Sequence, residues 1–247
     1  MDIIEFIDVH KYFGKKKVLR GVSFKIKEGS TSVIMGPSGT GKSTVIKLMV
    51  GLILPTKGKV IVEGKDVAKL NKEELLELRK KVGFAFQFGA LFDSMSIYDN
   101  IAFPLREHTK LSEKEIKKEV INAINMVGLN PDDVLHLYPD ELSGGMQKRA
   151  AIARTIILKP DIILYDEPTS GLDPIASDLI SRLIVKLQKE LGTTSVVISH
   201  DIKESFKIAD QMIMLYDGKV LAAREPEFFK TTDNPIVRKF IDGIATL

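Results

Sequence analysis

The segment that most restricts the fold of this chain is a glycine-rich stretch between two apolar patterns. Residues 36–44 read GPSGTGKST, which fits the spacing G-x-x-x-x-G-K-[ST]. The run before it, Thr31–Met35 (TSVIM), has the apolar and β-branched composition of a short buried strand. The segment after it, Lys42–Leu52, carries apolar residues at helical spacing and predicts a helix. A strand, a tight glycine loop and a helix in this order favour an α/β fold.

This loop has the chemistry of a phosphate-binding site. Glycine tolerates the dihedral angles that turn backbone N–H groups inward, and it lets phosphate oxygens come close. Lys42 offers a positive charge to the β- and γ-phosphates, the Ser43 hydroxyl is a Mg²⁺ ligand, and the helix start adds its dipole. The predicted nucleotide-binding residues are Gly36, Pro37, Ser38, Gly39, Thr40, Gly41, Lys42, Ser43 and Thr44. The motif indicates a nucleoside triphosphate, and the alternative is a chance glycine-rich turn.

Four short apolar runs predict the buried strands of a mostly parallel sheet. They are Thr31–Met35, Val82–Phe86, Asp161–Tyr165 and Thr194–Ser199. Their near-continuous hydrophobicity is typical of strands that helices cover on both faces. The stretch of about 93–159 shows no convincing strand, and Ser112–Glu115 has the pattern of a capping box before a helix. We interpret this stretch as a helical lobe inserted into an α/β core.

This pattern also predicts how the chain is divided. One domain spans residues 1–223, and a last short strand at Lys219–Ala223 closes it. The predicted parts are an α/β core at about 1–92 and 160–223, a helical lobe at about 93–159, and a polar tail at 224–247.

Composition excludes several kinds of site and partner. The chain has 247 residues, of which 44% are hydrophobic, enough for a sizeable core. It contains no Cys, so disulfides, thiolate metal sites and cysteine nucleophiles are excluded. A net charge of +3 is too small to indicate nucleic acid, which needs clustered Lys and Arg on one face.

The acidic start has no signal-peptide pattern, and no window approaches the ~18 apolar residues of a membrane span. We therefore expect another chain to hold the protein at any membrane where it works.

Two carboxylates follow one of the predicted strands. Asp166 and Glu167 come directly after the apolar run at Asp161–Tyr165. In open α/β sheets, active-site groups gather at the carboxyl ends of the strands, where the glycine loop also lies. We predict that Asp166 reaches Mg²⁺ through its water shell and that Glu167 orients and deprotonates an attacking water. An acidic pair alone is a weak signal, and the glycine loop strengthens it.

A third motif identifies a family. Leu142–Met146 reads LSGGM and precedes a helix predicted from about Gln147 to Leu158. A Ser hydroxyl, two Gly amides and a helix N-terminus form a second anion-binding surface, although a simple helix cap would use the same residues. The segment resembles the LSGGQ signature of the ABC ATPase family, with Met146 in place of the usual Gln. The resemblance implies that the signature residues contact the γ-phosphate of ATP held by a second copy of the chain. These residues are Ser143, Gly144 and Gly145.

Further landmarks of the same family follow in order. Gln87 matches the glutamine of the Q-loop, which contacts Mg²⁺ and water, and Ser170–Asp173 matches the D-loop. His200 follows the fourth predicted strand and matches the switch histidine at the γ-phosphate. Phe13 matches the aromatic residue that stacks on adenine. Tyr12 competes for that role, and a core position for Phe13 stays open.

The resemblance covers about residues 4–223 and implies both a fold and a reaction. The fold is a P-loop NTPase core of the RecA-like type with a mostly parallel sheet, an inserted ABC helical lobe and an antiparallel β element. The reaction is hydrolysis of MgATP by positioning and charge stabilisation, without a covalent intermediate. Its catalytic residues are Glu167, His200 and Gln87, and its metal ligands are Ser43, Gln87 and Asp166. Two chains sandwich ATP, so closure of the dimer is the mechanical output.

Three stretches of the sequence point to one branch of the family. The wording QFGALFDSMSIYDNIAFPLREHT from Gln87, the variant LSGGM, and RKFIDGIA at 238–245 resemble the ATPase subunit of bacterial Mce/Mla-type phospholipid transporters. The resemblance implies a peripheral subunit on the cytoplasmic side of the inner membrane. Its partners are a second copy of itself, a membrane permease, a periplasmic Mce-domain protein and, in Mla systems, a small STAS-domain protein. The apolar segment after Gln87, with Leu91 and Phe92, is where the permease is expected to dock.

Other functions stay open at this point. Within the family, the chain could serve an importer for amino acids or another small solute. A non-transport ABC protein acting on DNA or the ribosome is less favoured, because such proteins generally carry a long coiled-coil insertion or tandem ATPase domains. A P-loop switch or kinase leaves Leu142–Met146 and Asp173 without a role.

Overall fold

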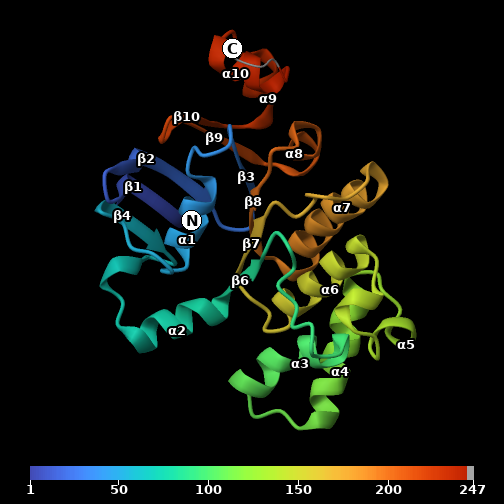
Figure 1. Cartoon of the computed structure of the whole chain (residues 1–247). Helices are drawn as coiled ribbons and strands as arrows, with labels where there is room; N and C mark the ends of the chain where they lie inside the picture. The colour runs from blue at the N-terminus through green and yellow to red at the C-terminus, as the bar shows by residue number, and fades with distance from the viewer. Residues whose placement is uncertain (244–247) are drawn as a thin grey trace. The chain divides into compact units, whose positions relative to one another are not determined.

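The computed structural model describes residues 1–243, and the predicted tail and the RKFIDGIA stretch extend beyond them into 244–247. The chain divides into two compact units (Figure 1). The first comprises Met1–Arg79 and the chain from Thr194 onward, and the second comprises Lys80–Thr193. The division into core, lobe and tail that the sequence suggests stays a prediction.

The first unit contains an antiparallel sheet built by the start of the chain. Its strands are β1 (Asp2–Phe13), β2 (Lys16–Lys27), β4 (Lys57–Val62) and β5 (Lys65–Asp66), in the spatial order β2-β1-β4-β5. β1 pairs with both β2 and β4, and Phe6 stacks on Phe24 with ring centroids 4.5 Å apart. A 3-10 turn, η1 (Val67–Lys69), follows β5. This sheet is the antiparallel β element that the family resemblance implied.

Four further strands of the first unit pair mostly in parallel. β3 (Thr31–Met35) lies between β8 (Thr194–Ile198) and β9 (Gln211–Tyr216) and runs parallel to both. β10 (Lys219–Arg224) pairs antiparallel with β9, so the order is β10-β9-β3-β8. Every residue of β3 and β8 is buried, which explains the continuous apolar runs that predicted them.

Among the described residues, five helices belong wholly or partly to this unit, and the first three are α1 (Lys42–Met49), α2 (Lys72–Lys81) and α8 (Ile202–Ile208). α1 begins where the sequence predicted, but it ends at Met49 and not at Leu52. The cause is Gly51, whose φ of 61° places it in the left-handed region and whose N–H bonds to the Leu48 carbonyl at 3.2 Å. Glycine ends helices in this way because it has no side chain to oppose that conformation.

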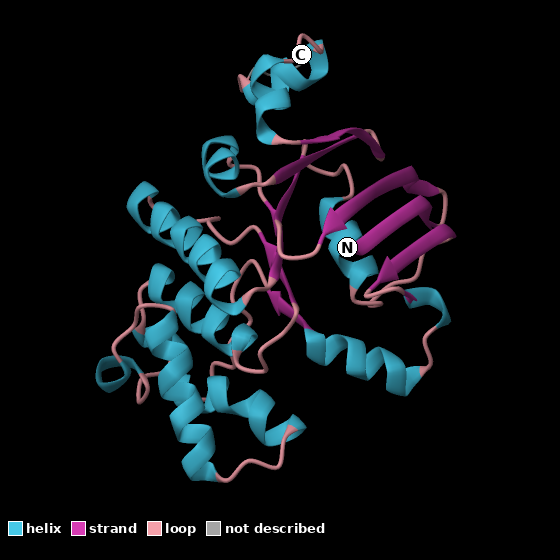
Figure 2. Ribbon diagram, turned by 180° about the vertical axis from the view of Figure 1, so that it is seen from behind, coloured by secondary structure: helices cyan, strands magenta, loops and turns pink. Residues whose placement is uncertain are grey.

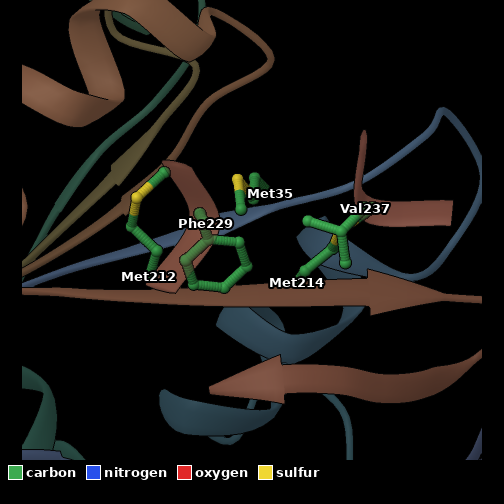
Figure 3. Close-up of a cluster of buried hydrophobic side chains, with 5 residues drawn as sticks. All are labelled: Met35, Met212, Met214, Phe229 and Val237. Carbon is green, nitrogen blue, oxygen red and sulfur yellow. The ribbon is translucent and has the colours of Figure 1, made fainter. Parts of the chain in front are cut away.

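The expected polar tail forms two short helices instead, α9 (Pro226–Thr231) and α10 (Pro235–Ile241). Figure 3 shows that Phe229 and Val237 from these helices pack against Met35, Met212 and Met214, all of them buried. In the structure each proline occupies the first turn of a helix, where its missing N–H costs nothing.

Helices dominate the second unit, as Figure 2 shows. Its two strands, β6 (Val82–Ala85) and β7 (Ile162–Asp166), are parallel. β6 ends one residue before the predicted run, and β7 is shifted by one residue toward the C-terminus. The helical elements are α3 (Ile97–His108), α4 (Glu113–Met126), α5 (Pro131–Val134), η2 (Pro139–Glu141), α6 (Gly144–Ile156) and α7 (Pro174–Leu191). The capping box predicted at Ser112–Glu115 is present at the start of α4. Across residues 1–243, no helix is both long enough and apolar enough to cross a bilayer.

The helix after the signature begins earlier than predicted. α6 begins at Gly144 and not at Gln147, because the Ser143 side chain caps it by accepting a hydrogen bond from the Met146 N–H at 3.4 Å. A serine cap lets the two glycines enter the first turn despite their low helix propensity. The signature therefore forms the helix N-terminus itself.

Candidate functional site

The glycine loop between β3 and α1 has the backbone shape that a phosphate group requires. Gly36, Gly39 and Gly41 have φ angles of 143°, 80° and 103°, all in the region that favours glycine. A Cβ atom on Gly36 would lie 2.1 Å from the Leu215 carbonyl oxygen, and one on Gly41 would lie 2.6 Å from Leu19 Cδ2. Side chains are thus excluded from two of the three positions. Left-handed residues within a tight loop make a concave row of N–H groups that binds anions.

The lysine of the loop folds back over it. Lys42 Nζ donates hydrogen bonds to the carbonyl oxygens of Gly36 at 2.8 Å and Pro37 at 3.1 Å. Thr40 also bonds the Pro37 carbonyl through its hydroxyl at 2.9 Å, which tightens the turn. Ser43 is exposed in the first turn of α1. The loop therefore presents a cation, a hydroxyl and a helix start at one place, a set that suits a phosphate with its Mg²⁺.

Two more predicted residues lie in the first unit. Phe13 ends β1, and 49% of its surface is exposed, so it does not belong to the core. The ammonium of Lys11 lies 5.0 Å from the centre of the Phe13 ring. The competing residue, Tyr12, is half-buried and shares a hydrogen bond of 3.2 Å with His10 Nδ1. His200 is exposed, two residues beyond the end of β8.

In the second unit, the predicted carboxylates lie at the carboxyl end of β7. Asp166 is the last residue of the strand and is half-buried. Glu167 follows with a φ of 50°, a left-handed conformation that is uncommon for a residue with a side chain. Its carbonyl oxygen accepts a hydrogen bond from the Ser170 N–H at 3.1 Å, which closes the turn. Strained residues of this kind occur most often at functional sites.

The Q-loop and D-loop residues meet in this unit. Gln87 lies in the turn after β6, and its side-chain amide donates to the Ser170 hydroxyl at 3.3 Å. No cluster of three or more acidic, histidine or cysteine side chains capable of holding a metal occurs among the described residues. Mg²⁺ usually binds through one or two carboxylates, water and substrate phosphates. Asp166 and Gln87 in this unit, and Ser43 in the other, carry the oxygen atoms that such a metal prefers.

The signature lines a cavity of about 260 Å³ together with the D-loop. Ser143, Gly144 and Gly145 form one wall, and Leu172 and Asp173 belong to the other. Asp173 is also the N-cap of α7, because its side chain accepts from the N–H groups of the next turn at 2.9 and 3.0 Å. The cavity thus combines two helix N-termini, both of which favour negative charge.

One residue of this region escaped the sequence interpretation. Lys148, on α6, donates from Nζ to the Gln87 carbonyl at 2.8 Å and to the Glu167 carbonyl at 3.4 Å. Burial lowers the pKa of Lys148, while the nearby Glu167 carboxylate raises it. The sequence alone did not indicate that Lys148, next to the basic residue Arg149, would contact two loops that are distant in the chain.

Comparisons with known proteins agree with this geometry. A family profile described as ABC transporter matches residues 19–170. The protein "Probable ribonucleotide transport ATP-binding protein mkl" of Mycobacterium tuberculosis (strain H37Rv) is 42% identical over 97% of this chain. The chain spans 66% of that relative's length. "Intermembrane phospholipid transport system ATP-binding protein MlaF" of Haemophilus influenzae is 42% identical over 93% of this chain and 86% of that protein.

A solved structure gives the same result for the fold. The ATP-binding cassette MJ0796, a dimer in a post-hydrolysis state bound to ADP and Pi, superposes with a TM-score of 0.82. It is 34% identical and covers 90% of this chain and 98% of that one. The predicted α/β fold and the family are thereby confirmed. The chain belongs to the ABC transporter family, within which it is an ATP-binding cassette.

Proposed function

We propose that this protein is the ATP-hydrolysing subunit of an ABC transporter that moves phospholipids within a bacterial envelope. The reaction rests on the glycine loop, whose backbone fits phosphate, and on Asp166 and Glu167 at the carboxyl end of β7 in the other unit. The cargo rests on the relatives named for intermembrane phospholipid transport, which match this chain over most of both lengths.

Each proposed residue has a role in ATP binding or hydrolysis that follows from its chemistry. Lys42 and the N–H groups of the loop bind and neutralise the phosphates, while Phe13 stacks on the adenine ring. Ser43, Gln87 and Asp166 are the side chains that would hold Mg²⁺, which would offset the charge of the phosphates. Glu167 takes the proton of the attacking water, and His200 supports the γ-phosphate. Hydrolysis needs no covalent intermediate, because positioning and charge stabilisation supply the catalysis.

A second copy of the chain completes the site in this proposal. Ser143, Gly144 and Gly145 of one copy contact the γ-phosphate bound to the other, so ATP holds two copies together. Support comes from the signature cavity with its two helix N-termini and from the dimeric state of MJ0796.

The other proposed partners lie in and beyond the membrane. A permease receives the segment after Gln87, where Phe88 and Phe92 are 88% and 43% exposed. Exposed aromatic side chains of this kind are common anchors of protein interfaces. A periplasmic Mce-domain protein and a small STAS-domain protein complete the assembly. The ATPase itself is then peripheral, on the cytoplasmic side of the inner membrane.

Ribonucleotide transport is the second candidate cargo. The mycobacterial relatives named for it are as similar to this chain as the phospholipid-transport relative from Haemophilus influenzae. Both cargoes imply the same ATPase chemistry, so only a transport measurement separates them.

The test uses the chain assembled with its permease in proteoliposomes. We expect ATP to drive transfer of a fluorescent phospholipid, with no ATP-dependent movement of radiolabelled ribonucleotide. Glu167→Gln should bind ATP normally but lower ATPase activity and lipid transfer about 10²- to 10⁴-fold, because an amide cannot accept the proton. Near-normal ATPase activity in that variant would reject Glu167 as the base. Ribonucleotide movement without lipid movement would reject the cargo.

A further inference from the structure

A half-buried lysine joins two loops of the second unit to the helix that carries the signature. Lys148 lies on α6, one turn after the signature glycines, and its side chain is half-buried. Its Nζ atom bonds the carbonyl oxygens of Gln87 at 2.8 Å and Glu167 at 3.4 Å. These two carbonyls follow neighbouring parallel strands, β6 and β7. One ammonium therefore fixes the ends of both strands to one helix.

The environment makes these bonds costly to lose. Removing the ammonium from water disfavours its charge, and the pKa of Lys148 is accordingly lowered by burial. A buried charge is tolerated only when nearby groups satisfy its donors. Hydrogen bonds from a charged group are also stronger than those between neutral groups. The contact is therefore a firm attachment and not an incidental surface bond.

The Glu167 main chain is the part that most needs such an attachment. Its left-handed conformation, with φ at 50°, is unfavourable for a residue with a side chain and persists only when neighbouring groups hold it. The Glu167 carbonyl is held from two sides, by the Ser170 N–H at 3.1 Å and by Lys148. The main-chain conformation of Glu167 restricts the rotamers that its side chain can adopt.

We propose that Lys148 is a positioning residue for ATP hydrolysis, which sets the direction of the Glu167 carboxylate and the place of Gln87 relative to the signature helix. The inference rests on the roles proposed above for Glu167 and Gln87. The expected effect is on the catalytic step, because Lys148 bonds the carbonyl oxygen of the proposed base Glu167 and that of Gln87.

A second cation on the same helix strengthens the link to the permease segment. Arg154 donates to the Gly89 carbonyl at 3.0 Å and approaches Asn100 Oδ1 at 3.5 Å. Asn100 is fully buried and bonds the main chain of Phe92 through both its oxygen and its nitrogen. Two side chains of α6 therefore hydrogen-bond the segment that begins at Gln87. A displacement of that segment would be transmitted through α6 to the signature and to Glu167.

The experiment compares Lys148→Met with a matched lysine in the same unit. Lys186 on α7 also donates to a backbone carbonyl, that of Met126 at 3.1 Å, but serves a different loop. In the full chain with its permease, Lys148→Met should lower kcat about 10- to 100-fold, the scale of a small misplacement of reacting groups. The Kd for ATP and the KM should stay within about twofold. Lys186→Met should leave kcat and KM within about twofold, and Lys148→Arg should recover part of the lost kcat, because it keeps a cationic donor.

Two further measurements separate the possible failures. If Lys148→Met does not fold, Lys148→Gln takes its place as the loss variant, because its side chain is polar but uncharged and one bond shorter than that of lysine. In the Glu167→Gln background, loss of Lys148 should cause little additional decrease in kcat, because both changes act on one step. Unchanged kcat in Lys148→Met, or equal losses in kcat and ATP affinity, would overturn the positioning role. Near-normal activity of Glu167→Gln alone would instead overturn the proposed catalytic assignment, and the two results are distinguishable.

Discussion

At Gly36 the main chain turns out of β3 with a φ of 143°, and a Cβ atom there would lie 2.1 Å from a carbonyl oxygen of β9. We expect Gly36→Ala to lose ATP binding and to lower the free energy of unfolding by about 3 kcal/mol or more, from strain and overpacking together. Gly29→Ala is the matched control, because Gly29 has a φ of 68° but open space around its Cβ position. It should cost only about 1–2 kcal/mol. Urea unfolding and nucleotide titration check both, and equal losses would reject the steric argument.

Phe13 and Tyr12 are adjacent but have different surroundings. Phe13 exposes 49% of its surface, whereas the hydroxyl of Tyr12 is hydrogen-bonded to His10. If Phe13 stacks on adenine, Phe13→Ala should weaken ATP binding at least about fivefold, since base stacking contributes about 1–3 kcal/mol. Phe13→Tyr should restore the affinity, and Tyr12→Ala should leave it nearly unchanged. A loss of affinity at Tyr12→Ala alone would transfer the role to Tyr12.

Between α3 and α4, one guanidinium holds two carboxylates. Arg106 bonds Glu113 through two nitrogens, each at 2.9 Å, and Asp99 at 2.9 Å. Hydrogen bonds from Ser96 and then Arg106 lower the pKa of Asp99, and the bond from Arg106 lowers that of Glu113. Because both pKa values are depressed by folding, their stabilisation is present above the ordinary values and is lost as pH falls through the folded ones.

This clamp predicts a pH-dependent effect of Arg106→Met. The variant should unfold at lower urea concentration than the wild type at pH 7, and the difference should shrink as pH falls below the ordinary values of 3.8 and 4.5. Lys110→Met, at an exposed lysine of the same connection, should show no such convergence. A difference that stays constant down to pH 3 would show that Arg106 acts by packing alone.

The sequence predicted elements best where burial is complete. β3 and β8 are buried along their whole length, so a continuous apolar run was a sufficient signal. The tail helices were missed because each is six or seven residues long, too short for a periodic pattern, and is anchored by a single buried side chain. The early start of α6 was missed for another reason. Two glycines argue against a helix, and only the Ser143 cap reverses that preference.

The chemical roles of the site residues were predictable from the sequence, but the hydrogen bonds that join them were not. Spacing alone indicated Lys42 and Ser43, because their roles are local to one loop. Lys148 was not predictable, since its two acceptors come from segments that only the fold brings beside α6. The roles of Glu167 and His200 stay predictions until variants are measured.

The proposed sharing of ATP between two copies can be tested with a mixed dimer. Lys42→Ala disables the phosphate loop of its own chain, whereas Ser143→Arg blocks the γ-phosphate bound to the opposite chain. Each homodimer then has two damaged sites and should be inactive. In the mixed dimer both substitutions affect the same ATP site. The second ATP site then combines an intact phosphate loop with an intact signature. We expect it to recover part of the ATPase activity.

Purification with two different affinity tags isolates the mixed dimer from both homodimers. Mixed wild-type and Lys42→Ala dimers provide the reference for one working site. Activity no higher than in either homodimer would show that the pairing is wrong or that both sites must work together.

The contact of Phe229 and Val237 with Met35 has a consequence for how the protein is made. Met35 is the residue immediately before the phosphate loop, yet its packing partners are translated far later. During translation, the whole glycine loop leaves the ribosome before the residues that complete the core beside it have been synthesised. The hydrophobic cluster beside the loop is therefore complete only after the segment containing Val237 has been synthesised, and an interrupted translation product would carry the complete motif without all of that cluster.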